Sequence, residues 1–109
     1  MEFNTELIKG STKNLLLAIL AAEPMYGYQI IKALREKSDD LLQFGEGTIY
    51  PVLHQLEKDK LLSSEWRKES QFPERKYYAI TPKGQRQLKT SLKEWKSFTK
   101  TVNQIYAAI

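Results

Sequence analysis

The feature that most constrains this chain is a long stripe of apolar residues near its C-terminal end. Thr81-Pro82 is a typical helix start, because threonine caps free backbone N–H groups and proline at the first helical position loses no hydrogen bond. Apolar side chains then recur at steps of three, four or seven residues, the spacing of one helix face, for about six turns. They are Leu88, Leu92, Trp95, Val102, Tyr106 and Ile109, with Phe98 beside them and Thr99 in a polar gap.

The length of the chain limits what can cover this stripe. With 109 residues, the chain has the size of one small domain, whose core is too small to bury the whole stripe. A partner chain is the simplest solution. We therefore expect a homodimer with the six stripe residues at its interface, and two regions packed as one compact unit, 1–81 and a dimerisation helix over 82–109.

The composition argues against several classes of protein. The chain has no cysteine, which removes disulfides and thiolate chemistry and fits a cytoplasmic location. Its longest apolar run, Leu15 to Ala22, has eight residues, far fewer than the roughly 20 of a membrane-spanning helix. His54 is the only histidine, and no paired carboxylates or phosphate-cradling glycine loop accompany it. We expect no enzyme activity, no metal, no cofactor and no membrane contact.

Positive charge is concentrated in the second part of the chain. Residues 1–62 carry seven Lys or Arg against nine Asp or Glu, a net charge of −2. Residues 63–109 carry ten against four, a net charge of +6. An anionic partner would respond to this second part, although a basic surface can also serve solubility alone.

Helical periodicity predicts three helices before residue 60. The first contains Leu7 and Ile8, is apolar nearly all round from Leu15 to Ala22, and should be deeply buried and end at Glu23-Pro24. The second covers about Tyr26 to Lys37. The third covers about Thr48 to Asp59, and its start should lie within a few residues before Pro51, since proline is tolerated only there.

The third helix has two distinct faces. The first is apolar and should pack on the core; its members are Ile49, Val52, Leu53 and Leu56. The opposite face points outward; its members are Gly47, Tyr50, Pro51, His54, Gln55 and Lys58. A solvated face without a task has the same pattern, so the face alone does not decide its role.

A period of two follows the third helix and predicts a β-hairpin. Its strands cover Leu62–Lys68 and Lys76–Ile80, and residues 69–75 join them. Four cations cluster on this ribbon, namely Arg67, Lys68, Arg75 and Lys76. Three aromatic residues, Tyr28, Trp66 and Tyr78, are expected in the core.

The order of three helices, a hairpin and a long helix indicates a mainly α fold with a β-hairpin, a winged helix-turn-helix with a long C-terminal dimerisation helix. In that fold the third helix enters the major groove of DNA and the hairpin, or wing, touches the flanking backbone. The fold by itself is only an analogy for function.

Five motifs, in order and spacing, resemble the signature of the PadR-like regulators over nearly the whole chain. They are Gly27-Tyr28, Gly47-Thr48-Ile49-Tyr50-Pro51, Leu56-Glu57, Arg75-Lys76-Tyr77-Tyr78, and Thr81 with Gly84. The length of the last helix suggests the subfamily with a short C-terminal helix.

The chain departs from the family pattern at Lys60, where the family usually has glycine. The third helix must therefore end in a left-handed non-glycine residue or close differently. Two acids in the loop 69–74 also put phosphate contact by the loop tip in doubt.

The resemblance implies a DNA-binding surface on the third helix and the wing. Tyr50 can contact phosphate or sugar, and Gln55 can pair with an adenine edge. The expected DNA-binding residues are Thr48, Tyr50, Pro51, His54, Gln55, Lys58, Arg67, Lys68, Arg75 and Lys76, with Lys9 and Lys13 near the chain start. Ordinary exposed charge is the alternative for the wing cations and for the two lysines.

The resemblance also permits an effector site. In some relatives, a tryptophan of the last helix stacks on flat, often cationic compounds at the dimer centre, and Trp95 with Leu92 and Phe98 could do the same here. Packing at the dimer interface is the alternative role of Trp95. We expect a homodimeric repressor on a pseudo-palindromic operator in duplex DNA, relieved by a planar aromatic effector. A winged-helix protein-interaction module without DNA binding is the alternative function.

Overall fold

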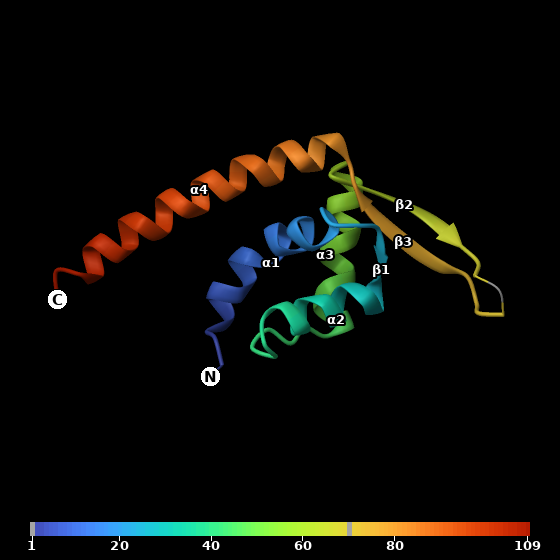
Figure 1. The fold of residues 1–109 in the computed structure, drawn as a ribbon, viewed down its shortest axis with the longest axis horizontal. Helices are drawn as coiled ribbons and strands as arrows, with labels where there is room; N and C mark the ends of the chain where they lie inside the picture. The colour runs from blue at the N-terminus through green and yellow to red at the C-terminus, as the bar shows by residue number, and fades with distance from the viewer. Residues whose placement is uncertain (1, 70) are drawn as a thin grey trace.

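The computed structural model describes residues 2–69 and 71–109 and has four helices and three short strands in this range. Figure 1 shows α4 lying along one side of the molecule, α1 between α4 and α2, and β2 and β3 projecting at one end. In chain order the elements are α1 (Thr5–Leu20), β1 (Met25–Tyr26), α2 (Gly27–Lys37), α3 (Glu46–Lys58), β2 (Leu62–Arg67), β3 (Arg75–Ile80) and α4 (Pro82–Tyr106). The predicted fold class, mainly helical with a hairpin, is confirmed.

The core lies where α1, α2 and α3 meet the sheet. Leu16, Leu17, Ile30, Ile49 and Leu53 are fully buried there. The apolar face predicted for α3 is confirmed, because Leu56 is also fully buried and Val52 packs against the same cluster.

The prediction for the first helix was partly wrong. Helix α1 ends at Leu20, before Glu23-Pro24, and Ala18, Ala21 and Ala22 are exposed. Alanine side chains bury little area, so their exposure costs the fold little. Only the leucine and isoleucine face of this segment enters the core.

The sheet contains one strand that the sequence pattern did not reveal. Its order is β1-β3-β2, and both pairs are antiparallel. Strand β1 has two residues, Met25 and Tyr26, which pair with Tyr78 and Tyr77 of β3. Two residues are too short to show a period of two, so this strand could not be detected by alternation.

Two local predictions about helix ends are confirmed. Thr81 caps α4, since its hydroxyl accepts a hydrogen bond of 3.0 Å from the backbone N–H of Gly84. Lys60 has φ of 62°, the left-handed conformation that glycine would adopt more easily. The backbone N–H of Leu61 then donates to the carbonyl of Leu56 at 2.9 Å, which closes the end of α3.

Helix α4 extends well beyond the core that its first turns contact. The molecule measures 58 Å along its longest axis, against 31 and 20 Å along the others. Leu88 packs against the core, whereas Leu92, Trp95, Tyr106 and Ile109 are exposed in the single chain. The predicted stripe is therefore mostly uncovered in the single chain.

Candidate nucleic-acid interface

The outward side of α3 presents the residues of this helix that are expected to bind DNA. We call this surface the recognition face; it comprises Thr48, Tyr50, Pro51, His54, Gln55 and Lys58. All are exposed except Tyr50, which is half-buried. The side-chain amide of Gln55 donates to the carboxylate of Asp59 at 3.0 Å, which leaves its carbonyl oxygen free of that bond. Lys58 is the only cation among the six.

Tyr50 is held against the start of α2. A Cβ atom on Gly27 would collide with the phenol ring and hydroxyl of Tyr50, so the absence of a side chain at Gly27 makes room for this ring. The ring also packs on the core and lies 6.3 Å from that of His54, centroid to centroid. Two of the sequence motifs thus meet in one contact, which fixes the direction of Tyr50.

Both arginines of the wing lie on aromatic rings. The guanidinium of Arg67 stands 4.5 Å from the centre of the Tyr77 ring, and that of Arg75 stands 4.5 Å from the centre of the Tyr26 ring. These rings contact each other edge to face at 5.4 Å. Cation–π contacts of this kind attract a guanidinium to the ring face and hold it in place. Arg67 also pairs with Glu65 at 2.6 Å.

Glu57 connects the recognition helix to the wing. Its carboxylate accepts a short hydrogen bond from the hydroxyl of Ser64 in β2 and pairs with the ammonium of Lys76 in β3 at 3.1 Å. The side chains of Glu57 and Lys76 are 32% and 28% exposed. We call these three residues the α3–wing cluster. It fixes the orientation of the ribbon relative to α3.

The α3–wing cluster shifts the pKa of both charged partners. The hydrogen bond from Ser64 has the largest effect and lowers the pKa of Glu57 below its ordinary value of 4.5; burial opposes this change, and Lys76 lowers the pKa further. The hydrogen bond to Glu57 raises the pKa of Lys76 above 10.5. Both groups therefore stay charged at neutral pH. The ammonium of Lys76 is engaged by Glu57, so its predicted phosphate contact would require it to leave or share this carboxylate.

The remaining predicted cations are exposed and lie apart. Lys68 follows β2 on the wing, whereas Lys9 and Lys13 lie in α1. The start of α1 and the tip of the wing are at different ends of the molecule (Figure 1). The structure thus brings the recognition face together with the base of the wing, but not with Lys9 and Lys13. Ser70 of the predicted wing loop lies outside the described residues.

Comparisons with known proteins decide which family this arrangement represents. Residues 16–90 match the model of the transcriptional regulator PadR-like family. The chain belongs to this family. A solved transcriptional regulator from Clostridium thermocellum is 33% identical, with a TM-score of 0.84, and the match covers 92% of this chain and 97% of that one. A PadR-like transcriptional regulator from Bacillus cereus is 34% identical, with a TM-score of 0.80, over 93% and 96% of the two chains.

A curated relative matches by sequence. It is an uncharacterised protein from Lysinibacillus sphaericus, 30% identical over 91 residues, or 84% of each chain. PadR-like proteins are DNA-binding transcription regulators and not enzymes. Within the part of the chain that the structure describes, no helix is long and apolar enough to span a membrane. No group of three or more potential metal ligands is found among residues 2–69 and 71–109.

Two aromatic residues of this PadR-like chain are exposed where the sequence predicted core. Trp66 is 64% exposed and Tyr28 is 59% exposed, whereas Tyr78 is buried as predicted. Trp66 lies opposite Lys76 in the sheet, on the same face as Ser64, which contacts α3. Tyr28 lies in the first turn of α2. Both are therefore additional candidates for contact with a nucleic acid.

The sequence contains a signal for the exposure of each of these two residues. Tyr28 is two positions before Ile30, about 200° away around a helix of 3.6 residues per turn, and so cannot share its buried face. Trp66 directly precedes the charged run Arg67-Lys68-Glu69, which marks the end of the strand that leaves the core. The prediction placed Tyr28 and Trp66 in the core because they are aromatic, and it gave too little weight to their positions in the helix and in the strand.

Proposed function

We propose that this PadR-like regulator is a homodimeric repressor that binds a pseudo-palindromic operator. The observation that carries this proposal is the α3–wing cluster, because it makes the recognition face and the wing one rigid unit. A winged helix needs such a unit to place its helix in the major groove and its ribbon on the flanking backbone at the same time. We propose that the protein acts in the cytoplasm.

Each part of the unit has a separate task. Gln55 and Thr48 contact base edges, while Tyr50, Pro51, His54 and Lys58 contact the sugar–phosphate backbone or pack beside it. Arg67, Arg75 and Lys68 bind flanking phosphates, with Lys76 in support, and Lys9 and Lys13 bind more distant ones. Since Lys58 is the only cation on the recognition face, specificity rests on few base contacts and on DNA shape.

The second protomer covers the apolar stripe of α4. Leu92, Trp95, Tyr106 and Ile109 are large and exposed in one chain, and a two-fold axis along α4 would bury them against the same residues of the partner. Leu88 and Val102, which are already half-buried, complete the interface. Two recognition helices then face two half-sites.

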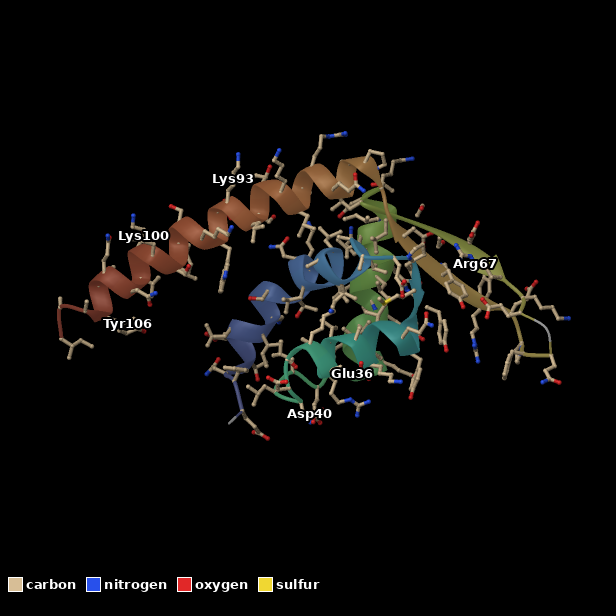
Figure 2. All side chains as sticks on the ribbon, in the orientation of Figure 1. Glu36, Asp40, Arg67, Lys93, Lys100 and Tyr106 are labelled. Atoms are coloured by element: carbon tan, nitrogen blue, oxygen red, sulfur yellow. The ribbon has the colours of Figure 1, made fainter. Side chains whose placement is uncertain are left out.

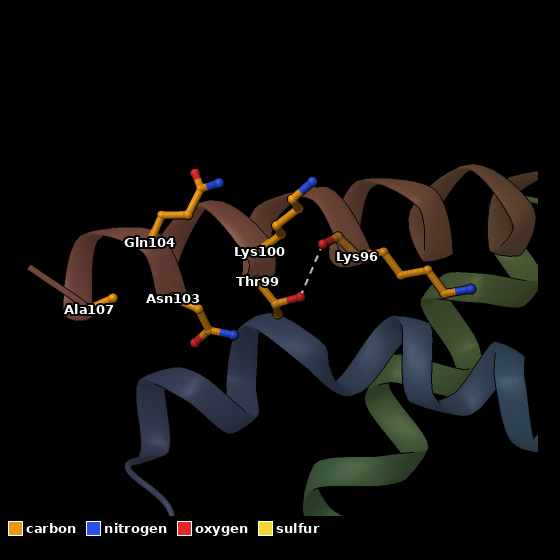
Figure 3. A pocket seen from close by; sticks show the side chains of 6 residues that line it. All are labelled: Lys96, Thr99, Lys100, Asn103, Gln104 and Ala107. Atoms are coloured by element: carbon orange, nitrogen blue, oxygen red, sulfur yellow. Dashed lines mark hydrogen bonds between the residues drawn. The ribbon is translucent and has the colours of Figure 1, made fainter.

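An effector site at this interface is a further part of the proposal. Leu92, Trp95 and Phe98 are exposed, and Trp95, at 54%, offers an indole face to a planar aromatic ligand. The shallow groove drawn in Figure 3, about 540 Å³, is lined by residues of α4 and its C-cap, namely Lys96, Thr99, Lys100, Asn103, Gln104 and Ala107, and not by Trp95. An effector stacked on Trp95 would therefore need the second protomer to complete its site.

Selection from a library of randomised DNA duplexes tests the DNA-binding proposal. We expect the native protein to enrich a pseudo-palindromic sequence and to bind it about 10³-fold or more tighter than random duplex. The double variant Tyr50→Ala and Arg75→Ala should weaken this binding by at least about tenfold, because it removes one backbone contact and one phosphate contact per protomer. Phe3→Ala with Arg35→Ala is the control, since it also removes one aromatic side chain and one arginine, here from exposed positions outside α3 and the wing.

The same experiment addresses the alternative function. If the native protein and the Tyr50→Ala and Arg75→Ala variant bind every duplex equally poorly at low salt, the operator proposal is wrong. The chain would then be a winged-helix protein-interaction module, which the sparse charge of the recognition face would suit.

A further inference from the structure

Helix α4 has a row of cations on the side opposite its apolar stripe. The row comprises Arg86, Lys89, Lys93, Lys96 and Lys100, and we call it the basic stripe. With 3.6 residues per turn, its members fall within an arc of about 80° centred roughly opposite Trp95. All five are exposed. Figure 2 shows Lys93 and Lys100 pointing away from α1 and the rest of the molecule.

The basic stripe has no acidic partner in the structure. The three ion pairs found among the described residues lie in α2, in the wing and between α3 and the wing, and none involves α4. Glu94 is the only acid of α4, and its neighbours three and four positions away are Thr90, Ser91, Ser97 and Phe98. Successive members of the stripe are three or four residues apart, so like charges adjoin along the helix and weaken it. An external anion would relieve this repulsion.

Within the described part of residues 63–109, the basic stripe contains most of the cations that form no ion pair, cation–π contact or side-chain hydrogen bond. In the wing, Arg67 and Arg75 lie on tyrosine rings, and Lys76 pairs with Glu57. The five cations of the stripe have no such partner, so a large part of the positive charge of residues 63–109 lies on α4, outside the recognition face and the wing.

The stripe is long enough to lie beside several phosphates of a DNA strand. From Arg86 to Lys100 the helix rises about 21 Å, so one cation occurs every 5 Å or so along a straight line. One strand of duplex DNA carries a phosphate about every 3.4 Å along its axis. A rigid row of this kind can lie along a backbone and contact several phosphates without reading bases.

We propose that the outer face of α4 is a second, sequence-independent DNA-binding surface, with which an operator-bound dimer holds another DNA duplex. The stripe is opposite the apolar stripe, so the dimer proposed above leaves it on the outside. A membrane surface fits less well, because a helix in a lipid interface inserts its apolar face, which the partner protomer covers. The inference adds to the proposed function and rests on its dimer and its DNA-binding recognition face.

A bridging experiment tests this surface. One random-sequence duplex is fixed to beads, a labelled duplex of the same length is added in solution, and capture of the label by full-length protein is measured at low salt. We expect Lys93→Gln, Lys96→Gln and Lys100→Gln together to reduce capture at least about tenfold, while retention of the protein on the beads changes less than twofold. The slope of the logarithm of capture against the logarithm of salt concentration should become shallower by about one unit for each phosphate contact removed.

Two control variants separate the stripe from net charge and from folding. Lys32→Gln, Arg35→Gln and Lys37→Gln remove the same charge from exposed positions of α2 and should leave capture unchanged. The triple arginine variant at positions 93, 96 and 100 keeps the charge and should capture like the native protein. Circular dichroism checks that every variant is folded.

Each other result overturns the inference. Capture that is unchanged in the triple glutamine variant places bridging elsewhere, and retention of native protein without capture excludes a second surface. The native protein could instead float with vesicles that contain one-third anionic lipid, lose this flotation in the triple glutamine variant, and capture no second duplex. This result would identify the stripe as a membrane-binding surface. If the native protein is not retained on the beads at all, the proposed function fails together with this inference, whereas retention without capture overturns the inference alone.

Discussion

At the scale of single residues, Glu57 joins the two parts of the DNA-binding unit. It belongs to α3, yet both of its partners, Ser64 and Lys76, belong to the wing. A carboxylate that accepts a hydroxyl hydrogen bond and an ammonium ion pair is stabilised in its charged form. The charge of Glu57 therefore controls how firmly the wing is attached to α3.

Replacing Glu57 by glutamine should lower stability in a pH-dependent manner. The amide keeps the shape but loses the charge-assisted bonds, so we expect a loss of about 1–2 kcal/mol at pH 7. The native pKa is lowered below 4.5, so this contribution is complete above that value and is lost as the pH falls through the native pKa. Thermal unfolding of both proteins from pH 7 to pH 3 measures the difference, which should shrink below pH 4.5. A constant difference over this range would show that the charge of Glu57 has no part in it.

Helical periodicity in the sequence predicted the recognition face better than it predicted the contacts around that face. The period of α3 placed His54, Gln55 and Lys58 outward, because periodicity alone determines which side of a helix a residue occupies. It could not reveal that Lys76 faces Glu57, since this pair joins elements whose relative position depends on the whole fold. For the same reason, Trp66 was assigned to the core although its strand continues beyond the core.

At the scale of the elements, the start of α4 is fastened to the end of α3. The hydroxyl of Thr81 donates to the carbonyl of Lys60 at 2.7 Å, and the ammonium of Lys83 donates to the carbonyl of Asp59 at 3.0 Å. Gly84 is buried against the carbonyl of Leu61, and a Cβ atom there would collide with this oxygen and lie 2.8 Å from Cγ1 of Ile80. A displacement of α4 would therefore be passed to the C-terminal end of the recognition helix.

Gly84→Ala should destabilise the protein although alanine favours helices. The added methyl group meets a backbone carbonyl, which cannot move away as a side chain could, so we expect a loss of about 1–3 kcal/mol. Gly10→Ala is the matched control, because Gly10 also lies within a helix and has nothing within 4 Å of its Cβ position. This control should gain up to about 1 kcal/mol. Chemical denaturation measures both changes, and equal effects of the two substitutions would show that the contact of Gly84 with Leu61 is unimportant.

At the scale of the whole molecule, the length of α4 explains why one chain leaves so much apolar surface uncovered. The sequence already predicted this result, because a stripe of six turns exceeds what 109 residues can bury. Only the first turns of α4 reach the core, through Leu88, and the rest of the helix extends the molecule to 58 Å. Exposed patches of this kind mark protein interfaces. How α4 would pair with a second chain in the proposed dimer depends on both chains, and no pattern within one sequence specifies it.

Trp95→Glu should convert the proposed dimer into a monomer. Removing a central aromatic anchor typically costs 2 kcal/mol or more, about 30-fold in the dissociation constant, and a carboxylate buried in its place adds a desolvation cost. Ser97→Glu is the matched control, since Ser97 is exposed on the same helix but lies well away from the apolar stripe. Sedimentation velocity between about 1 and 100 µM should show that the native protein and Ser97→Glu are dimers and that Trp95→Glu is mainly monomeric. A dimer of ordinary stability dissociates at the lower concentrations when it is weakened by this amount.

A native protein that stays monomeric at the highest concentration would remove the basis for the two-fold operator and for an effector site between protomers. A dimer that tolerates Trp95→Glu would instead place the interface on another surface and leave the indole of Trp95 free for a ligand.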